Sequence, residues 1–201
     1  MGKLRTMIPA NRLSSSLVYA DWVIDQPDGS FTATAGYELG GQDININTTD
    51  INSFLWRYYY EDNSIKIFRV DDPDRVLEID TIPGITQLSL TFDQSLVPTY
   101  TYIQNGSTYL KWYDTTDQTY KVTNFGPSFR SPKVCLDIKD KLSTVSDVLF
   151  FYMKNNNQLC VRYQRDRYST EYVLANMPPH QILRVGVNKL NRVQFLVEEL
   201  I

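Results

Sequence analysis

Carboxylates are the only side chains with catalytic potential that this chain of 201 residues carries in quantity. It has 23 Asp and Glu but a single histidine, His180, which follows two prolines and is expected to be a solvated or capping loop residue. Glycosidases pair two carboxylates, but Glu38, Glu78 and Asp93 cannot be paired from their spacing, and the arginine cluster of a sialidase is not recognisable. The motifs of serine hydrolases, P-loop proteins and dinucleotide-binding proteins do not occur. We therefore expect that the protein is not an enzyme.

Metal and cofactor sites are not expected either. The acidic segment 71–74 (DDPD) resembles part of a calcium-binding loop, but it lacks the glycine and the closing glutamate of an EF-hand. A turn between two strands explains this segment without a metal. Cys135 and Cys160 lie inside strand-like patterns and lack the spacing of a metal or redox pair, so we expect small buried side chains in a reducing cytoplasm.

The segment 162–168 (RYQRDRY) is the densest run of basic and aromatic residues. It can stack on single-stranded nucleic acid, pair with the acidic first half of the chain across an interface, or be a strand with Tyr163 packed and its arginines in water. Because Tyr and Arg commonly anchor protein interfaces, the run is the first candidate for a contact surface, and a nucleic-acid partner is not expected. The candidate interface residues are Arg162, Tyr163, Arg165, Arg167 and Tyr168.

Charge is distributed unevenly along the chain, whose formal net charge is −3. Residues 1–129 hold 9 Lys and Arg against 16 Asp and Glu, whereas residues 130–201 hold 11 against 7. The basic residues of the second half are interleaved with acids, as on a solvated face. A molecule with two oppositely charged ends also suits head-to-tail ring assembly. There is no signal peptide and no run of 18 apolar residues, so a membrane partner is not expected.

The segment 99–125 predicts a three-stranded antiparallel meander. The Asn-Gly pair at 105–106 is a strong hairpin signal, because both central residues of a type I′ turn need a positive φ. In the strand that follows, side chains alternate between the two faces, so Leu110 and Trp112 lie opposite Lys111. We expect Trp112 to belong to the core.

This meander is one of three similar units. The units lie near 54–82, 88–125 and 134–175, with 43 and 50 residues between matched positions, and two further strands fall at 182–198. That period and strand count are typical of β-propeller blades. We therefore predict an all-β fold with antiparallel meanders arranged as a small or incomplete β-propeller-like stack.

The units divide the chain into two parts. Residues 1–50 are expected to form an N-terminal arm with edge strands and a docking segment, and residues 51–201 the bladed domain. Strands from 17–50 and 182–198 can build a fourth unit together, or the stack can stay open and be covered by a neighbouring copy. Because exposed sheet edges are a liability unless they are paired, we expect a homo-oligomer or a larger assembly in either case.

Two stretches carry a resemblance to a protein family. Residues 88–114 (LSLTFDQSLVPTYTYIQNGSTYLKWYD) and residues 147–174 (DVLFFYMKNNNQLCVRYQRDRYSTEYVL) resemble a repeat of virion structural proteins from tailed bacteriophages. The resemblance extends over residues 54–198. It implies a β-bladed structural component of a phage particle, assembling in multiple copies at the head–tail connector, collar or tail, and it transfers no catalytic residue.

The resemblance also implies partners and a location. The partners would be other phage structural proteins, namely connector, collar or tail subunits. The protein would be made in the host cytoplasm and found in the virion. The alternative is a receptor- or carbohydrate-binding tail module, in which exposed aromatic residues such as Trp22 and Trp56 would be platforms for sugars.

Overall fold

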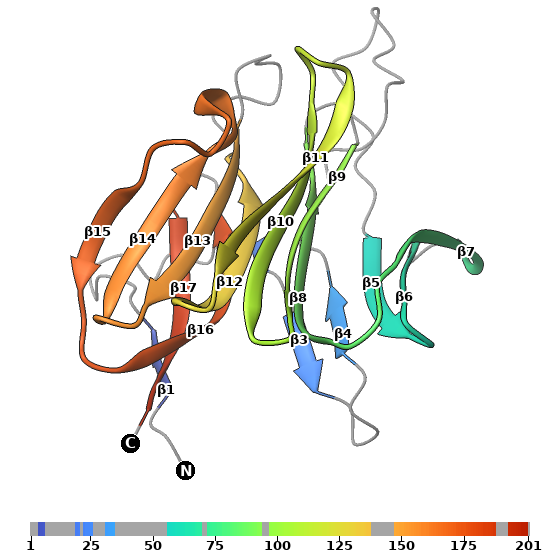
Figure 1. Ribbon diagram of the computed structural model, residues 1–201. Coiled ribbons are helices and arrows are strands. Elements are labelled where there is room, and N and C mark those ends of the chain that lie inside the picture. Colours follow the sequence, from blue (N-terminus) through green and yellow to red (C-terminus); the bar gives the residue numbers. More distant parts are fainter. Residues whose placement is uncertain are drawn as a thin grey trace, which may run out of the picture.

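The structure is almost entirely β-strand, which confirms the prediction of an all-β fold. The computed structural model describes residues 56–69, 72–93, 97–137, 147–187 and 193–200, and the backbone of four short N-terminal strands (Figure 1). The helical element of these residues is one 3-10 turn, η1 (Gln164–Asp166). A search of the described residues for a long apolar helix that would cross a lipid bilayer finds none.

Seventeen described strands form four antiparallel sheets. The first sheet has the order β3 (Trp22–Asp25), β4 (Phe31–Thr34), β5 (Trp56–Glu61), β6 (Ser64–Arg69) and β7 (Asp72–Thr81). The second sheet contains β8 (Ile85–Phe92), β9 (Pro98–Gln104), β10 (Ser107–Asp114) and β11 (Thr119–Gly126). The third sheet contains β12 (Phe129–Leu136), β13 (Val148–Lys154), β14 (Gln158–Tyr163) and β15 (Tyr172–Asn176). The terminal sheet has the order β1 (Leu4–Thr6), β17 (Val193–Glu199), β16 (His180–Val187) and β2 (Tyr19–Ala20).

The sheets contact one another in cyclic order. The inner strand β8 lies along β12, and β12 lies along β16 (Figure 1). The cycle closes through the first sheet, because β16 contacts β3, and β4 and β5 contact β8. The backbone N–H of Val134 donates a hydrogen bond of 3.1 Å to Ser89 Oγ and so joins β12 to β8. The described strands thus form a small propeller-like stack without a closed hydrogen-bonded barrel.

The predicted repeat units fall on the first three sheets. In the second and third sheets, an inner strand precedes a three-stranded meander. In the first sheet, β3 and β4 add two strands that the unit at 54–82 did not include. In the terminal sheet, β1 and β2 from the first 20 residues flank β17 and β16. The rest of the segment 1–50 lies outside the described residues, and its docking role stays a prediction.

The turn between β9 and β10 has the geometry that its Asn-Gly pair predicts. Asn105 has a φ of 49° and Gly106 a φ of 75°. The turn between β5 and β6 has the same two-residue form, with Asp62 at a φ of 51° and Asn63 at 63°. The two units therefore share hairpin geometry, although one of them reaches it without glycine.

Gly106→Ala should lower the free energy of unfolding by about 1–2 kcal/mol, as measured by urea denaturation. A Cβ added there would meet no atom within 4 Å, so the loss comes from the left-handed backbone alone. Asn105→Gly, at a positive φ in the same turn, is the control and should lose no stability. An equal loss in both variants would contradict this explanation.

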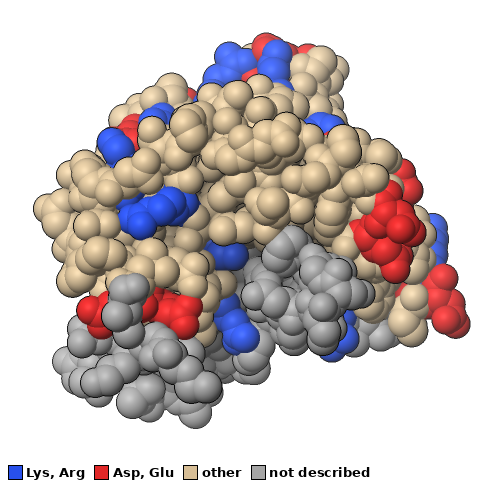
Figure 2. Space-filling model, turned by 60° about the horizontal axis from the view of Figure 1, so that its bottom comes forward, with Lys and Arg blue, Asp and Glu red and all other residues tan. Residues whose placement is uncertain are grey.

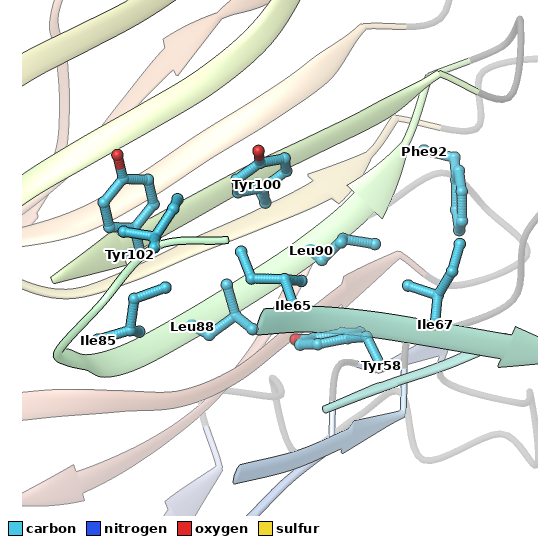
Figure 3. Close-up of a cluster of buried hydrophobic side chains, with 10 residues drawn as sticks. Tyr58, Ile65, Ile67, Ile85, Leu88, Leu90, Phe92, Tyr100 and Tyr102 are labelled. Atoms are coloured by element: carbon cyan, nitrogen blue, oxygen red, sulfur yellow. The ribbon is translucent and has the colours of Figure 1, made fainter. Parts of the chain in front are cut away.

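Apolar side chains fill the spaces between successive sheets. In the cluster between the first and second sheets, Tyr58 and Ile65 pack with Leu88 and Leu90 (Figure 3). Two further clusters lie between the second and third sheets and between the third and terminal sheets. The inner strands of the second and third sheets are therefore buried on both faces, which explains why neither sheet can be stable as an isolated meander.

Strand β10 shows the alternation that its sequence predicts. Leu110 and Trp112 are buried against the third sheet, whereas the intervening Lys111 is partly exposed on the opposite face. The two cysteines also behave as predicted, because Cys135 and Cys160 are both buried and form no disulfide. Burial raises the pKa of Cys160 to about 11, so its thiol stays neutral near pH 7.

Candidate interaction surface

The basic-aromatic run lies at the junction of the second and third sheets. It starts in the last residues of β14 and continues through η1. Arg167 and Tyr168 then both have a φ of 58°, in the left-handed region that residues with a Cβ rarely adopt. This tight reversal turns Arg167 toward solvent and Tyr168 toward the core, and the five candidate residues of the run have different environments.

Tyr168 belongs to the core. It is 2% exposed, and its ring meets that of Trp112 edge to face, with 5.3 Å between ring centroids. Burial raises the pKa of Tyr168 well above its ordinary value. Tyr168 therefore anchors the loop of the third sheet against the second sheet of the same molecule.

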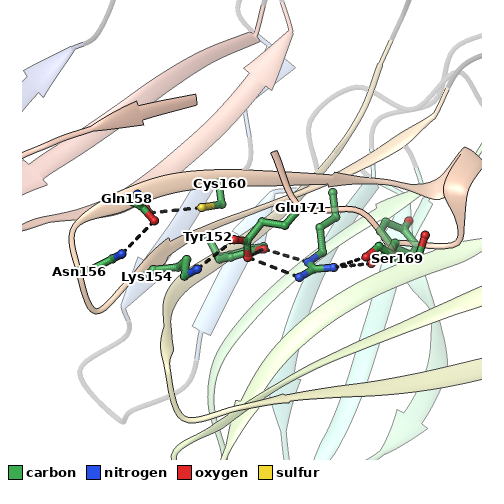
Figure 4. Close-up of polar contacts among 9 residues, drawn as sticks. Tyr152, Lys154, Asn156, Gln158, Cys160, Ser169 and Glu171 are labelled. Atoms are coloured by element: carbon green, nitrogen blue, oxygen red, sulfur yellow. Dashed lines mark hydrogen bonds and ion pairs between the residues drawn. The ribbon is translucent and has the colours of Figure 1, made fainter. Parts of the chain in front are cut away.

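A polar network on the third sheet includes Tyr152, Lys154 and Glu171 (Figure 4), and Arg162 is its centre. Its side chain is 16% exposed. Its Nε donates to Tyr152 Oη at 2.9 Å, and its Nη1 donates to the carbonyl oxygens of Tyr168 and Ser169, each at 2.9 Å. The guanidinium carbon also lies 5.2 Å from the ring centroid of Phe125. Arg162 thus holds the left-handed loop onto β14.

Glu171 completes this network. Its carboxylate accepts hydrogen bonds from Tyr152 Oη at 2.6 Å and from Lys154 Nζ at 2.9 Å, and it lies 3.4 Å from Arg162 Nη2. Burial opposes ionisation of the carboxyl, but these hydrogen bonds outweigh it and lower the pKa of Glu171. The network is therefore a satisfied set of charges that supports the fold.

Arg165 lies at the surface, whereas Tyr163 is half-buried and packs against the apolar cluster between the third and terminal sheets. The Arg165 side chain is 53% exposed, and its guanidinium lies 4.5 Å from the ring centroid of Tyr163. Arg165 also pairs with the Asp147 carboxylate at 3.4 Å. The ring of Tyr163 meets Tyr172 of β15 edge to face at 5.3 Å. These residues form a continuous aromatic and basic surface that leads from the run to the outer strand of the third sheet.

Arg167 clamps the third sheet to the second. Its guanidinium pairs with Asp114 at the end of β10 and, at 2.8 Å, with Asp117 in the turn that follows. Lys121 pairs with Asp117 from the other side at 2.7 Å. At this position the basic second half and the acidic first half of the chain meet within one molecule. An intermolecular role for the run stays a prediction.

Acidification should destabilise the protein by protonating Asp114, which pairs with Arg167. Burial opposes ionisation of Asp114, but hydrogen bonds from Arg167 and from two backbone N–H groups prevail and lower its pKa below the ordinary 3.8. A carboxyl with a lowered pKa stabilises the folded state above its unfolded pKa, and this contribution disappears as the pH falls through the folded pKa. We expect the melting temperature to fall on acidification below about pH 4, and less steeply in Asp114→Asn. Asp74→Asn, at an exposed position, is the control; equal slopes in all three proteins would contradict the prediction.

The outermost strands of the first three sheets expose apolar side chains, a feature that the sequence did not lead us to expect. These exposed residues are 39–55% accessible. They are Val76 and Leu77 on β7, Tyr120 and Val122 on β11, and Tyr172, Val173 and Leu174 on β15. Each of the three strands has one hydrogen-bonded neighbour among the described strands and leaves its other edge open. The sequence signal was the run of adjacent apolar residues at 76–77 and 172–174, because a strand with one solvated face would alternate.

The described acidic and histidine residues that were considered for catalysis make local hydrogen bonds that support the fold. Glu78 is exposed on β7 and accepts a hydrogen bond from the Thr81 hydroxyl, and Asp93, after β8, accepts one from the backbone N–H of Val97. His180 is 2% exposed at the start of β16, with Nδ1 2.7 Å from the Pro178 carbonyl oxygen. Of the two expected alternatives, a solvated or a capping residue, the solvated one is therefore wrong. Glu38 and the side chains of Trp22 and Trp56 lie outside the described part of the structure.

Within the described ranges, no three His, Cys, Asp or Glu side chains are grouped as a metal site would require. Comparison of the chain with protein-family models, with curated proteins and with solved structures finds no match.

Proposed function

We propose that this protein is a structural subunit that assembles in multiple copies in a bacteriophage particle, at the head–tail connector, collar or tail, and that it has no catalytic role. The observation that carries the proposal is the exposure of apolar side chains on β7, β11 and β15. Open strand edges with exposed apolar residues pair readily with other chains, and stable monomers usually protect them. A subunit whose edges are covered by neighbours explains why these strands lack that protection.

The phage context comes from the resemblance of residues 88–114 and 147–174 to a virion repeat. The two stretches share two equivalent strands of the fold, because β9 and β10 of the first correspond to β13 and β14 of the second. The first stretch adds the inner strand β8, and the second adds the outer strand β15. The proposed partners are therefore other connector, collar or tail subunits, and the proposed location is the virion.

Quantitative mass spectrometry of purified phage particles tests this function. The expected result is several copies of the protein in each particle, retained after a salt wash that removes adsorbed host proteins. Sedimentation of the purified protein should show concentration-dependent association. A protein that is absent from particles and monomeric at all concentrations would overturn the proposal.

A receptor- or carbohydrate-binding module is the second candidate, and one aromatic surface favours it. Tyr120 on β11 is 44% exposed and meets Tyr113 edge to face at 5.4 Å. Lys111 Nζ lies 5.5 Å from the Tyr120 ring centroid and 2.6 Å from the Asp80 carboxylate. An exposed ring beside paired charges can stack on a sugar and bind its hydroxyls. Glycan binding that is lost in Tyr120→Ala but kept in Tyr172→Ala would favour this candidate.

A further inference from the structure

We propose that copies of this protein join head to tail, with the outer edge of β15 in one copy packed on the outer edge of β7 in the next. This inference depends on the proposed multi-copy assembly and names the two surfaces that produce it. The surfaces are called here the β15 edge (residues 172–176) and the β7 edge (residues 72–81). They lie on opposite sides of the molecule, β15 at the left and β7 at the right of Figure 1.

Both edges have an apolar centre. On the β15 edge, three consecutive residues, Tyr172 to Leu174, are 47–49% exposed, so both faces of the strand are open there. Residues 172–179 contain no charged side chain. On the β7 edge, Val76 and Leu77 are 43% and 39% exposed. Packing the two centres together would remove apolar surface from water in both copies.

The two edges differ in charge around these centres, because the β7 edge is acidic and the β15 edge is uncharged. The β7 edge has one Arg against four Asp and Glu, and Asp72, Asp74 and Glu78 are exposed. Figure 2, which keeps the left and right of Figure 1, shows acidic side chains gathered on the β7 side of the molecule. The β15 edge itself carries no charged side chain, and the basic residues Lys154 and Arg162 that precede it are already paired with Glu171. The β15 edge can therefore cover the apolar centre of the β7 edge without bringing like charge against its carboxylates.

Charge also argues against pairing of identical edges. Two β7 edges facing each other would bring exposed carboxylates together, and like charges opposite each other destabilise a strand pair. A β15–β7 contact avoids this repulsion. Because its two surfaces are different and lie on opposite sides, each copy can bind two neighbours, so the assembly is a ring or a filament.

Two substitutions block one edge each. Val76→Glu places a charge in the centre of the β7 edge, and Leu174→Glu does the same on the β15 edge. Each should weaken self-association about tenfold or more, because a charge would have to be desolvated in the contact. Val122→Glu is the matched control, because Val122 is 55% exposed on the third outer strand, β11. All three positions are exposed, and circular dichroism verifies that the variants fold.

Mixing the two blocked variants identifies the pairing by native mass spectrometry. Wild type and Val122→Glu should form oligomers, each blocked variant alone should be monomeric, and their equimolar mixture should form a 1:1 dimer through the one intact edge of each. Oligomers of wild-type size in either blocked variant, or a mixture that stays monomeric, would overturn the β15–β7 contact while leaving multi-copy assembly in place. A wild type that is monomeric at all concentrations would overturn the proposed function as well.

Discussion

Trp112→Ala is expected to lower the free energy of unfolding by about 3–5 kcal/mol. Trp112 is 5% exposed and lies in the apolar cluster between the second and third sheets, beside Leu110, Val134 and Tyr168. Truncation would remove buried apolar area and leave a cavity between two sheets that cannot collapse onto each other without moving β12. It would also remove the edge-to-face contact with Tyr168, which anchors the left-handed loop.

Equilibrium urea unfolding monitored by circular dichroism measures this loss. The control is Val122→Ala, which deletes an exposed side chain on β11 and should change stability by less than about 0.5 kcal/mol. A loss below about 1 kcal/mol in Trp112→Ala would contradict the position of this ring in a packed space between sheets.

Arg162→Leu is expected to lower the free energy of unfolding by about 3 kcal/mol. The leucine keeps part of the apolar stem but leaves Glu171, the Tyr152 hydroxyl and two backbone carbonyl oxygens without the guanidinium that satisfies them. Removing one partner of a mostly buried charge network is costly, because the remaining charge keeps its desolvation penalty. The loop that carries Tyr168 would lose its two hydrogen bonds to β14 as well.

Arg165→Leu is the matched control for this variant, three residues further along the same run. Its guanidinium is half exposed and lies 3.4 Å from the buried Asp147 carboxylate, which keeps its hydrogen bond from the Arg165 backbone N–H, so removal of the side chain should cost only about 1–2 kcal/mol. Thermal and urea unfolding of both variants should therefore separate them clearly. Equal losses, or the larger loss in Arg165→Leu, would contradict the assignment of Arg162 as the centre of the network.

The sequence predicts local features of this fold well where one physical constraint dominates. The Asn-Gly pair requires a positive φ at both positions, and Asn105 and Gly106 both have it. The two-residue alternation in β10 separates Leu110 and Trp112 from Lys111, because each face of the strand meets a different environment. The recurrence of matched positions after 43 and 50 residues predicts stacked sheets, since one such sheet cannot bury its apolar faces alone.

Features that depend on tertiary context could not be predicted in this way. The run 162–168 is rich in basic and aromatic residues, but the left-handed backbone at Arg167 and Tyr168 turns one of these residues outward and the other into the core. The burial of His180 depends on its position at the start of β16, which two preceding prolines did not indicate. The open outer strands follow from sheet order, which no local pattern encodes.

A cryo-electron microscopy map of the assembled protein, in the particle or as a purified oligomer, tests the central claim most directly. The account predicts that neighbouring copies cover the outer strands β7 and β15, with Val76 and Leu77 of one copy packed on Tyr172, Val173 and Leu174 of the next. A map in which these two strands face solvent in every copy, with the contacts made elsewhere, would contradict it.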